Sequence, residues 1–458
     1  MTIQLTRRGF LVGCSSAIAA LAGARVTNLA FSAPNQATSA YNNEILVQVF
    51  LRGGWDALNV VPPLGGTDRA AYVAARDDLV LPTSGTGALL NLDAQFGLHP
   101  AMAPLFSLYQ AQHLAFIHAV GLNNDTRSHF DAMQFIELGT PGNKATNTGW
   151  ITRHLQSATN LPPTILIPAV ATGGGMPTSL LNSTEAVSMT SPSSFDFAGY
   201  WKYEYDQRLT LRRMFDGDTW LFKAGLKTLD TVDIVEAANP GTYAPANGAV
   251  YPSGEFGDEL KAIAQMIKMN IGMRVATIDL GGWDTHEYEG NGSTGYMAGL
   301  LGTLAQGLTA FYTDLNGSGC ANYTSHLTVV VMSEFGRRLR ENASHGTDHG
   351  HGSVMLVLGG NVKGGKVYGQ WPGLSNAQLY DGNDLAVTTD YRRVLSEILM
   401  RRLGNANLAA VFPGYSLETP LDFVVDGYPV APPPPPGLNN KVYMPLVSSP
   451  DVPQACPY

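Results

Sequence analysis

The chain alternates short apolar runs with segments of helical periodicity. The apolar runs predict strands over residues 44–51, 113–120, 164–170, 273–280, 327–332 and 353–358. The periodic segments between them predict helices over residues 101–110, 130–138, 259–271, 297–315 and 391–403. Near-continuous Val, Ile and Leu strands that alternate with helices are typical of a mostly parallel sheet covered on both faces. We therefore expect a three-layer α/β/α domain from about residue 42 to about residue 428.

Two segments depart from this pattern. Residues 172–255 are richer in Gly, Ser, Asn and Pro and have weaker periodicity, so we expect an insertion or a cap over the sheet. Residues 432–436 are five consecutive prolines, which favour an extended and solvated spacer. We therefore interpret residues 429–458 as a Pro-rich linker followed by a tail that is either disordered or a small docking segment.

The N-terminus has the features of an export signal. Arg7 and Arg8 precede a short stretch of small and apolar residues that ends near Ala24, too short for a stable membrane anchor. The pattern resembles a twin-arginine signal, which predicts a signal peptide over residues 1–37 and transport of the folded protein by the twin-arginine translocase. The mature protein would then be periplasmic, extracellular or on the cell surface. A lipoprotein signal at Cys14 is disfavoured, because this cysteine precedes most of the apolar stretch.

Composition narrows the possible partners. The chain of 458 residues has 28 Lys and Arg against 37 Asp and Glu, a formal net charge of −9, and contains no basic run. This balance argues against a nucleic-acid partner. Of the three cysteines, Cys14 would leave with the signal, and Cys320 and Cys456 could pair. Two cysteines are too few for a disulfide scaffold or a Cys-based zinc site.

Acidic and imidazole side chains gather just after predicted strands. Ligands of open α/β folds bind at the carboxyl ends of strands, and mixed His, Asp and Glu sets suit zinc, manganese or similar divalent ions. A Gly-Gly-Trp-Asp sequence occurs twice, at residues 53–56 and 281–284. Any one of these histidines, taken alone, is better explained as a capped or hydrogen-bonded loop residue, and His345 is a weaker member of the set. Together they predict a metal site formed by Asp56, Asp284, His286, Glu334, Asp348, His349 and His351.

A second polar cluster, residues 125–131, follows a predicted strand and opens a predicted helix. Ser128 could be the N-cap of that helix. It could equally be a hydroxyl nucleophile, because the free N–H groups of a helix N-terminus bind phosphoryl or sulfuryl oxygens. Arg127 could hold an anionic group, and we group His129 with these two as catalytic residues. The chain has no Gly-x-Ser-x-Gly or P-loop motif, so an α/β-hydrolase or P-loop enzyme is not indicated.

Several segments together resemble one family. They are LVQVFLRGGWDALN, GLHPAMAPLF, SHFDAM, IDLGGWDTH, VVVMSEFGR, GTDHGHGSVMLVLGGNVKGGKVYG and DYRRVLSEIL. Over about residues 44–415 they resemble the exported bacterial family of domain of unknown function 1501, which is grouped with the alkaline phosphatase and sulfatase superfamily. The resemblance implies an alkaline phosphatase-like fold with one or two divalent ions (zinc, manganese or calcium) and a hydroxyl nucleophile at a helix N-terminus.

By position, the resemblance assigns the nucleophile to Ser128 and the first-strand metal ligand to Asp56. It assigns further metal ligands to Asp284, His286, Glu334, Asp348, His349 and His351. Glu334 stands where the superfamily usually has the Asp of an Asp-His-Gly motif.

These observations lead to one leading hypothesis and two rivals. The leading hypothesis is an exported, metal-dependent hydrolase that acts on phosphate or sulfate esters of small molecules or polymers. One rival is a non-enzymatic protein of binding or assembly that keeps the fold and contacts a cell-envelope partner through its C-terminal tail. The other is a protein that stores or transfers metal.

Overall fold

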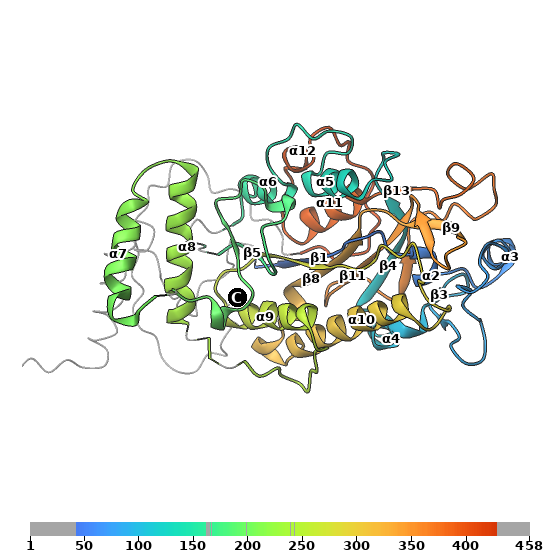
Figure 1. Cartoon of the computed structure of the whole chain (residues 1–458), viewed down its shortest axis with the longest axis horizontal. Coiled ribbons are helices and arrows are strands. Elements are labelled where there is room, and N and C mark those ends of the chain that lie inside the picture. Colours follow the sequence, from blue (N-terminus) through green and yellow to red (C-terminus); the bar gives the residue numbers. More distant parts are fainter. Residues whose placement is uncertain are drawn as a thin grey trace, which may run out of the picture.

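One nine-stranded sheet forms the centre of the protein, in the order β12-β4-β11-β8-β1-β7-β5-β6 with β13 beside β4 (Figure 1). A computed structural model describes residues 43–427 apart from 162–164, 166, 198, 239 and 242. The strands are β1 (Ile45–Leu51), β4 (Leu114–Gly121), β5 (Ala169–Ala171), β6 (Ala186–Ser188), β7 (Val275–Leu280), β8 (Leu327–Ser333), β11 (Ser353–Leu358), β12 (Lys366–Tyr368) and β13 (Thr389–Asp390). Only β11 runs antiparallel to its neighbours. The predicted mostly parallel sheet is confirmed.

Helices cover both faces of this sheet, as the unbroken apolar strands require. All seven residues of β1 are buried: Val47, Val49 and Leu51 pack into one core, Leu46 and Phe50 into the other. The first core lies against α4 (Ala103–Gln110), α9 (Glu255–Met269) and α10 (Tyr296–Leu315). The second lies against α5 (His129–Leu138), α6 (Trp150–Ser157), α11 (Tyr391–Arg401) and α12 (Leu408–Val411). The three-layer α/β/α prediction is therefore confirmed.

The remaining elements lie around these layers. They are α2 (Ala57–Val60), α3 (Gly66–Ala75), α7 (Glu204–Met214), α8 (Trp220–Ala237), the hairpins β2 (Leu90–Asn91) with β3 (Gly97–Leu98) and β9 (Arg337–Glu341) with β10 (Thr347–His349), and 3₁₀ turns at Pro100–Met102, Thr178–Leu180, Pro192–Ser194, Trp201–Tyr203, Gly319–Ala321 and Thr324–His326. None of the helices in the described residues is long and apolar enough to cross a membrane.

The segment 172–255 contains both sheet and helix. Its strand β6 pairs in parallel with β5, whereas α7 and α8 lie side by side at one end of the molecule (Figure 1). An insertion or cap over this range stays a prediction. The signal peptide, the Pro-rich tail and the pairing of Cys320 with Cys456 lie outside what the structure describes.

Strand direction brings distant segments to one edge of the sheet. Strands β1, β4, β7 and β8 run the same way, so their carboxyl ends meet at that edge. Strand β11 runs the opposite way, so the loop that enters it arrives at the same edge. Turns that are far apart in sequence therefore converge, and they carry most of the predicted site residues.

A buried ionic cluster lies next to this edge of the sheet. The guanidinium of Arg76, at the end of α3, binds both carboxylate oxygens of Asp56, and neither side chain is exposed to solvent. Glu289 also lies here and accepts hydrogen bonds from Thr285 and Thr347 on the same oxygen. Its other oxygen, Oε1, is buried without a donor in the described part of the chain. Burial, and next the charge of Asp56, raise the pKa of Glu289 to about 8, so its carboxyl is mostly protonated at neutral pH.

We predict that Arg76→Met lowers the free energy of unfolding by about 3–5 kcal/mol, because it leaves the Asp56 carboxylate buried without its partner. Lys144→Met removes an exposed pair with Asp131 and is the matched control, expected to cost about 1 kcal/mol or less. Urea denaturation of both variants measures the difference. Equal losses would contradict the assignment of a buried pair.

We also predict that Glu289→Gln stabilises the protein at high pH relative to the parent chain. A folded-state pKa raised from 4.5 to about 8 means that the parent loses stability as the pH rises between these values. Glutamine has no proton to lose, so the difference in melting temperature between variant and parent should shift in favour of the variant from pH 5 to pH 9. Exposed Glu287→Gln is the control. A difference that does not change with pH would contradict the assignment.

Candidate metal centre

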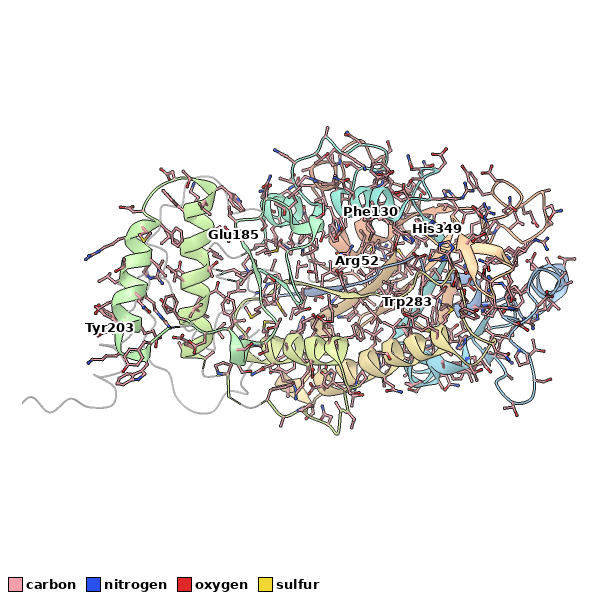
Figure 2. All side chains as sticks on the ribbon, viewed as in Figure 1. Arg52, Phe130, Glu185, Tyr203, Trp283 and His349 are labelled. Carbon is pink, nitrogen blue, oxygen red and sulfur yellow. The ribbon has the colours of Figure 1, made fainter. Side chains whose placement is uncertain are left out.

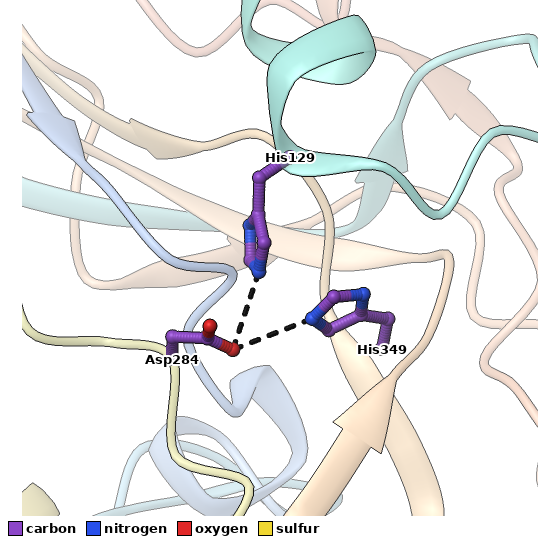
Figure 3. Close-up of side chains that lie close together, drawn as sticks. All are labelled: His129, Asp284 and His349. Carbon is purple, nitrogen blue, oxygen red and sulfur yellow. Dashed lines mark hydrogen bonds and ion pairs between the residues drawn. The ribbon is translucent and has the colours of Figure 1, made fainter.

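Three imidazole nitrogens converge on one carboxylate at the carboxyl edge of the sheet. The Nε2 atoms of His129, His286 and His349 lie 3.2, 3.2 and 3.3 Å from Oδ1 of Asp284. Figure 3 shows His129 and His349 directed at Asp284. His129 is the first residue of α5, Asp284 and His286 lie in the turn after β7, and His349 ends β10. The described residues include a potential cation site at His129, Asp284 and His349.

Each histidine of this cluster is oriented by an oxygen at its other ring nitrogen. Nδ1 of His129 lies 2.7 Å from the Glu334 carboxylate, and Nδ1 of His349 lies 2.7 Å from the backbone carbonyl of Arg127. Nδ1 of His286 lies 3.2 Å from the Asp348 carboxylate. Because these oxygens are acceptors, we infer that Nδ1 carries the proton in each neutral ring and that Nε2 presents a lone pair. Metal-binding histidines are held in this way.

Two of these ring nitrogens lie very close together. Nε2 of His286 and Nε2 of His349 are 2.8 Å apart, a distance at which two lone pairs repel unless a proton or a metal ion lies between or beside them. Nε2 of His129 is buried and donates to no acceptor among the described residues. The donor set therefore fits a bound cation.

The surroundings of the cluster shift the pKa values of its members in different directions. Burial would raise the pKa of Asp284, but the hydrogen bond and charge of Arg337, with His129 and His286, lower it to about 2. Burial lowers the pKa of His349, as does the charge of His129, so its lone pair is available at neutral pH. For His129, burial is outweighed by Glu334 and Asp284, and the pKa rises.

Arg337, a residue that sequence reasoning did not single out, ties the turns of the site together. Its side chain is fully buried, and it donates 2.6 Å to Oδ1 of Asp284. It also donates to four backbone carbonyls from three separate segments: Gly53 and Gly54 in the turn after β1, Trp283 in the turn after β7, and Thr347 at the start of β10. The signal that could have found it is an arginine three residues after Glu334, directly beyond a buried strand.

The two Gly-Gly-Trp-Asp turns pack against each other, but their aspartates diverge. A side chain at Gly53 (φ +125°) would place a Cβ 2.5 Å from the backbone nitrogen of Asp284. Trp55 and Trp283 are buried with their ring centroids 5.7 Å apart. The tryptophans are therefore core residues and do not line a cleft. Asp284 reaches the histidines, whereas the carboxylate of Asp56 is held by Arg76, so Asp56 is not part of the cluster.

Glu334 and Asp348 were predicted as metal ligands, and the structure gives both a different place. Both oxygens of the buried Glu334 have partners: Oε1 accepts from Gly53 N at 2.8 Å and faces His129, and Oε2 accepts from Ser333. Asp348 contacts His286 and accepts from Asn342 at 3.2 Å. These two carboxylates orient histidines of the cluster instead of joining it.

His351, Arg127 and His345 also lie outside the cluster. His351 stacks on Tyr380 with 4.3 Å between the ring centroids, and burial, with the charge of Arg127, lowers its pKa to about 4. The predicted anion-binding residue Arg127 is already paired with Asp384 at 2.7 Å and with a second carboxylate, that of Asp381. His345 pairs with Asp78 at the surface.

Ser128 is the N-cap of α5, and it lies between two residues that contact the cluster. Its Oγ accepts from Asp131 N at 3.4 Å, which is a long capping bond. The carbonyl of the preceding residue accepts from His349, and the following residue is His129. The structure thus satisfies the capping role, and Ser128 directly precedes His129 of the cluster in the sequence.

Comparisons with known proteins give one family and two kinds of solved structure. The chain is similar to Ps i-CgsB in complex with k-i-k-neocarrahexaose (10% identity, 71% of this chain and 68% of that chain, TM-score 0.33). It is also similar to alkaline phosphatase from the Antarctic bacterium TAB5 (9% identity, 72% and 95%, TM-score 0.28). Similarity of this degree does not bear on the activity. No curated protein matches the chain.

The family comparison agrees with the resemblance drawn from the sequence motifs. The matched range includes Asp284, His286 and His349, three of the four residues of the cluster, and it ends before the C-terminal tail. His129, from α5, lies outside it. Residues 240–407 of the chain match the family described as "Protein of unknown function (DUF1501)".

Proposed function

We propose that the chain is a metal-dependent hydrolase of phosphate or sulfate esters, with one divalent cation held by His129, Asp284, His286 and His349. The observation that carries the proposal is the convergence of three Nε2 atoms on one carboxylate oxygen. Each of these histidines has an oxygen partner at Nδ1. In metal sites, hydrogen bonds of this kind fix the orientation of the imidazole ligands.

The donor set narrows the choice of ion. Three imidazoles and one carboxylate suit zinc, and manganese less well, whereas calcium prefers six to eight oxygen ligands. The cluster offers one carboxylate, so we favour zinc over calcium. When bound, such an ion supplies Lewis-acid stabilisation of the negative charge that develops on an ester under attack.

Ser128 is the proposed nucleophile. Its Oγ would attack phosphorus or sulfur and form a serine ester while the bond to the alcohol breaks, and the hydroxyl proton would leave with the alcohol. Water then hydrolyses the serine ester. The N-terminus of the ten-residue helix α5 supports this role, because its first N–H groups have no partner within the helix and favour anionic oxygens.

Export and attachment stay predictions from the sequence. The twin-arginine signal over residues 1–37 and the tail over residues 429–458 support a periplasmic or cell-surface location with a cell-envelope partner. Metal binding without turnover of any ester would favour the non-enzymatic or metal-storage alternatives.

We predict that the chain, purified without chelator, contains about one equivalent of zinc or manganese by mass spectrometry. His286→Ala and His349→Ala should each weaken metal binding by at least about 100-fold in a competition assay, because each removes a ligand. His113→Ala is the control and should leave binding unchanged, because His113 stacks on Tyr312 at the opposite, amino-terminal end of β4. Affinity should fall below about pH 6.5, since protons compete for the imidazole lone pairs. A chain that takes up no metal from a metal-replete solution would sink the proposal.

We predict that Ser128→Ala lowers turnover of p-nitrophenyl phosphate or p-nitrophenyl sulfate by at least about 10³-fold, as expected for loss of a nucleophile. Thr219→Ala is the matched control, because Thr219 is also an N-cap whose side chain accepts a backbone N–H, at the start of α8. Both variants lose a cap worth about 1 kcal/mol, so stability alone cannot explain a difference. Full turnover in a metal-loaded Ser128→Ala protein would exclude Ser128 as the nucleophile.

A further inference from the structure

A polar cavity of about 310 Å³ lies at the carboxyl ends of β1, β5 and β7. Its walls include Arg52 from the end of β1, Thr172 and Thr178 beyond β5, and Asp279 near the end of β7. Glu137 and Met176 also line the cavity. The mechanism proposed above uses none of these residues.

Helix α5 connects this cavity to the histidine cluster. His129, Met133 and Glu137 are spaced by four residues and therefore lie on one face of the helix. His129 reaches the cluster, whereas Met133 and Glu137 contact Arg52. At 1.5 Å per residue, Glu137 lies about 12 Å further along the helix than His129. Figure 2 labels Arg52 and Phe130, the second residue of α5, in the same region.

Arg52 and its partners present donors and acceptors side by side. Nε of Arg52 donates to Asp279 at 2.6 Å, and Nη2 donates to Glu137 at 3.1 Å. Nη1 faces the sulfur of Met133, a weak acceptor, at 3.3 Å. Of the five N–H groups of the guanidinium, two have no acceptor among the described residues. Asp279, whose side chain is 47% exposed, keeps one carboxylate oxygen without a donor there.

The combination of free N–H donors and a free carboxylate acceptor favours one class of ligand over two others. An anion would use the free N–H groups but would meet two carboxylates against one guanidinium, a net charge of −1. An ammonium group would use the carboxylates but would place its positive charge against the free N–H groups. A hydroxyl both donates and accepts, so neighbouring hydroxyls satisfy both sides. We propose that this cavity binds a polyhydroxylated ligand, such as a sugar ring.

The size and remaining walls suit such a ligand. Ligand pockets span about 300–1,000 Å³, so this cavity has room for a small ligand of one or two rings. Met176 and Pro177 give it an apolar wall for the C–H face of a ring, and Thr172 and Thr178 add further hydroxyl groups. The link to catalysis rests on the proposed function: the substrate would be a sugar ester whose polyol part lies at Arg52 and whose ester lies at the histidine cluster.

Binding tests this proposal without any turnover. We would titrate the full chain with lactose, maltose and cellobiose, and separately with sodium phosphate and spermidine, using ligand-observed NMR and calorimetry. We expect at least one disaccharide to bind with a dissociation constant near or below about 1 mM. His349→Ala should still bind it, so failure of the metal proposal and failure of this one are distinguishable.

Asp279→Asn is the decisive variant, because it keeps the shape of the side chain and leaves the Arg52–Glu137 pair in place. It should weaken disaccharide binding at least tenfold, and Thr178→Val should also weaken it. Asp218→Asn, a fully exposed aspartate between α7 and α8, is the matched control. Binding of phosphate or spermidine alone, no disaccharide binding up to roughly 20 mM, or binding unchanged in Asp279→Asn would each overturn the proposal.

Discussion

The buried guanidinium of Arg337 is the constraint on which the carboxyl edge of the sheet depends. A fully buried charge is tolerated only when it is paired and hydrogen-bonded. Here four backbone carbonyls from two turns and the start of β10 accept its N–H groups, and the carboxylate of Asp284 balances its charge. The turns after β1 and β7 and the start of β10 cannot separate without leaving N–H groups of this buried charge without acceptors, so the position of the candidate site follows from the folding of the edge.

Asp284 consequently has two functions that cannot be tested separately. Its carboxylate neutralises Arg337 and faces the three Nε2 atoms of the histidine cluster. A substitution at Asp284 would remove a proposed metal ligand and also leave the buried guanidinium of Arg337 without its partner. Substitutions of the histidines are easier to interpret. Each imidazole is oriented by its own oxygen partner at Nδ1, and removing one ring leaves the Arg337–Asp284 pair in place.

The sequence predicted the layers and much of the site, for identifiable reasons. Strand β11 was predicted with its observed bounds, because a six-residue apolar run between glycine-rich segments has few alternatives. Its antiparallel direction could not be predicted, since a strand buried on both faces has the same pattern in either direction. The short β5 begins at Ala169, five residues later than predicted, and α3, α6, α7 and α8 were not predicted.

The same contrast holds for single residues. Asp284 and His286 lie in the turn after β7, and His349 lies in the segment that enters β11, so the directions of the strands bring them to one edge. Asp56 follows a strand in the same way, yet Arg76, 20 residues later at the end of α3, binds it within the core. His129 was placed with the catalytic residues, because the sequence did not show that the first side chain of α5 turns toward Asp284.

The single helical face that runs from His129 to Glu137 has a consequence for the length of any substrate. An α-helix has a fixed rise per residue, so the distance between its first and third turns does not adjust to the ligand. His129, at the histidine cluster, and Glu137, at the cavity, are held about 12 Å apart along the helix axis. A ligand that occupies the cavity and the histidine cluster at once must therefore fit a separation that helix α5 keeps constant.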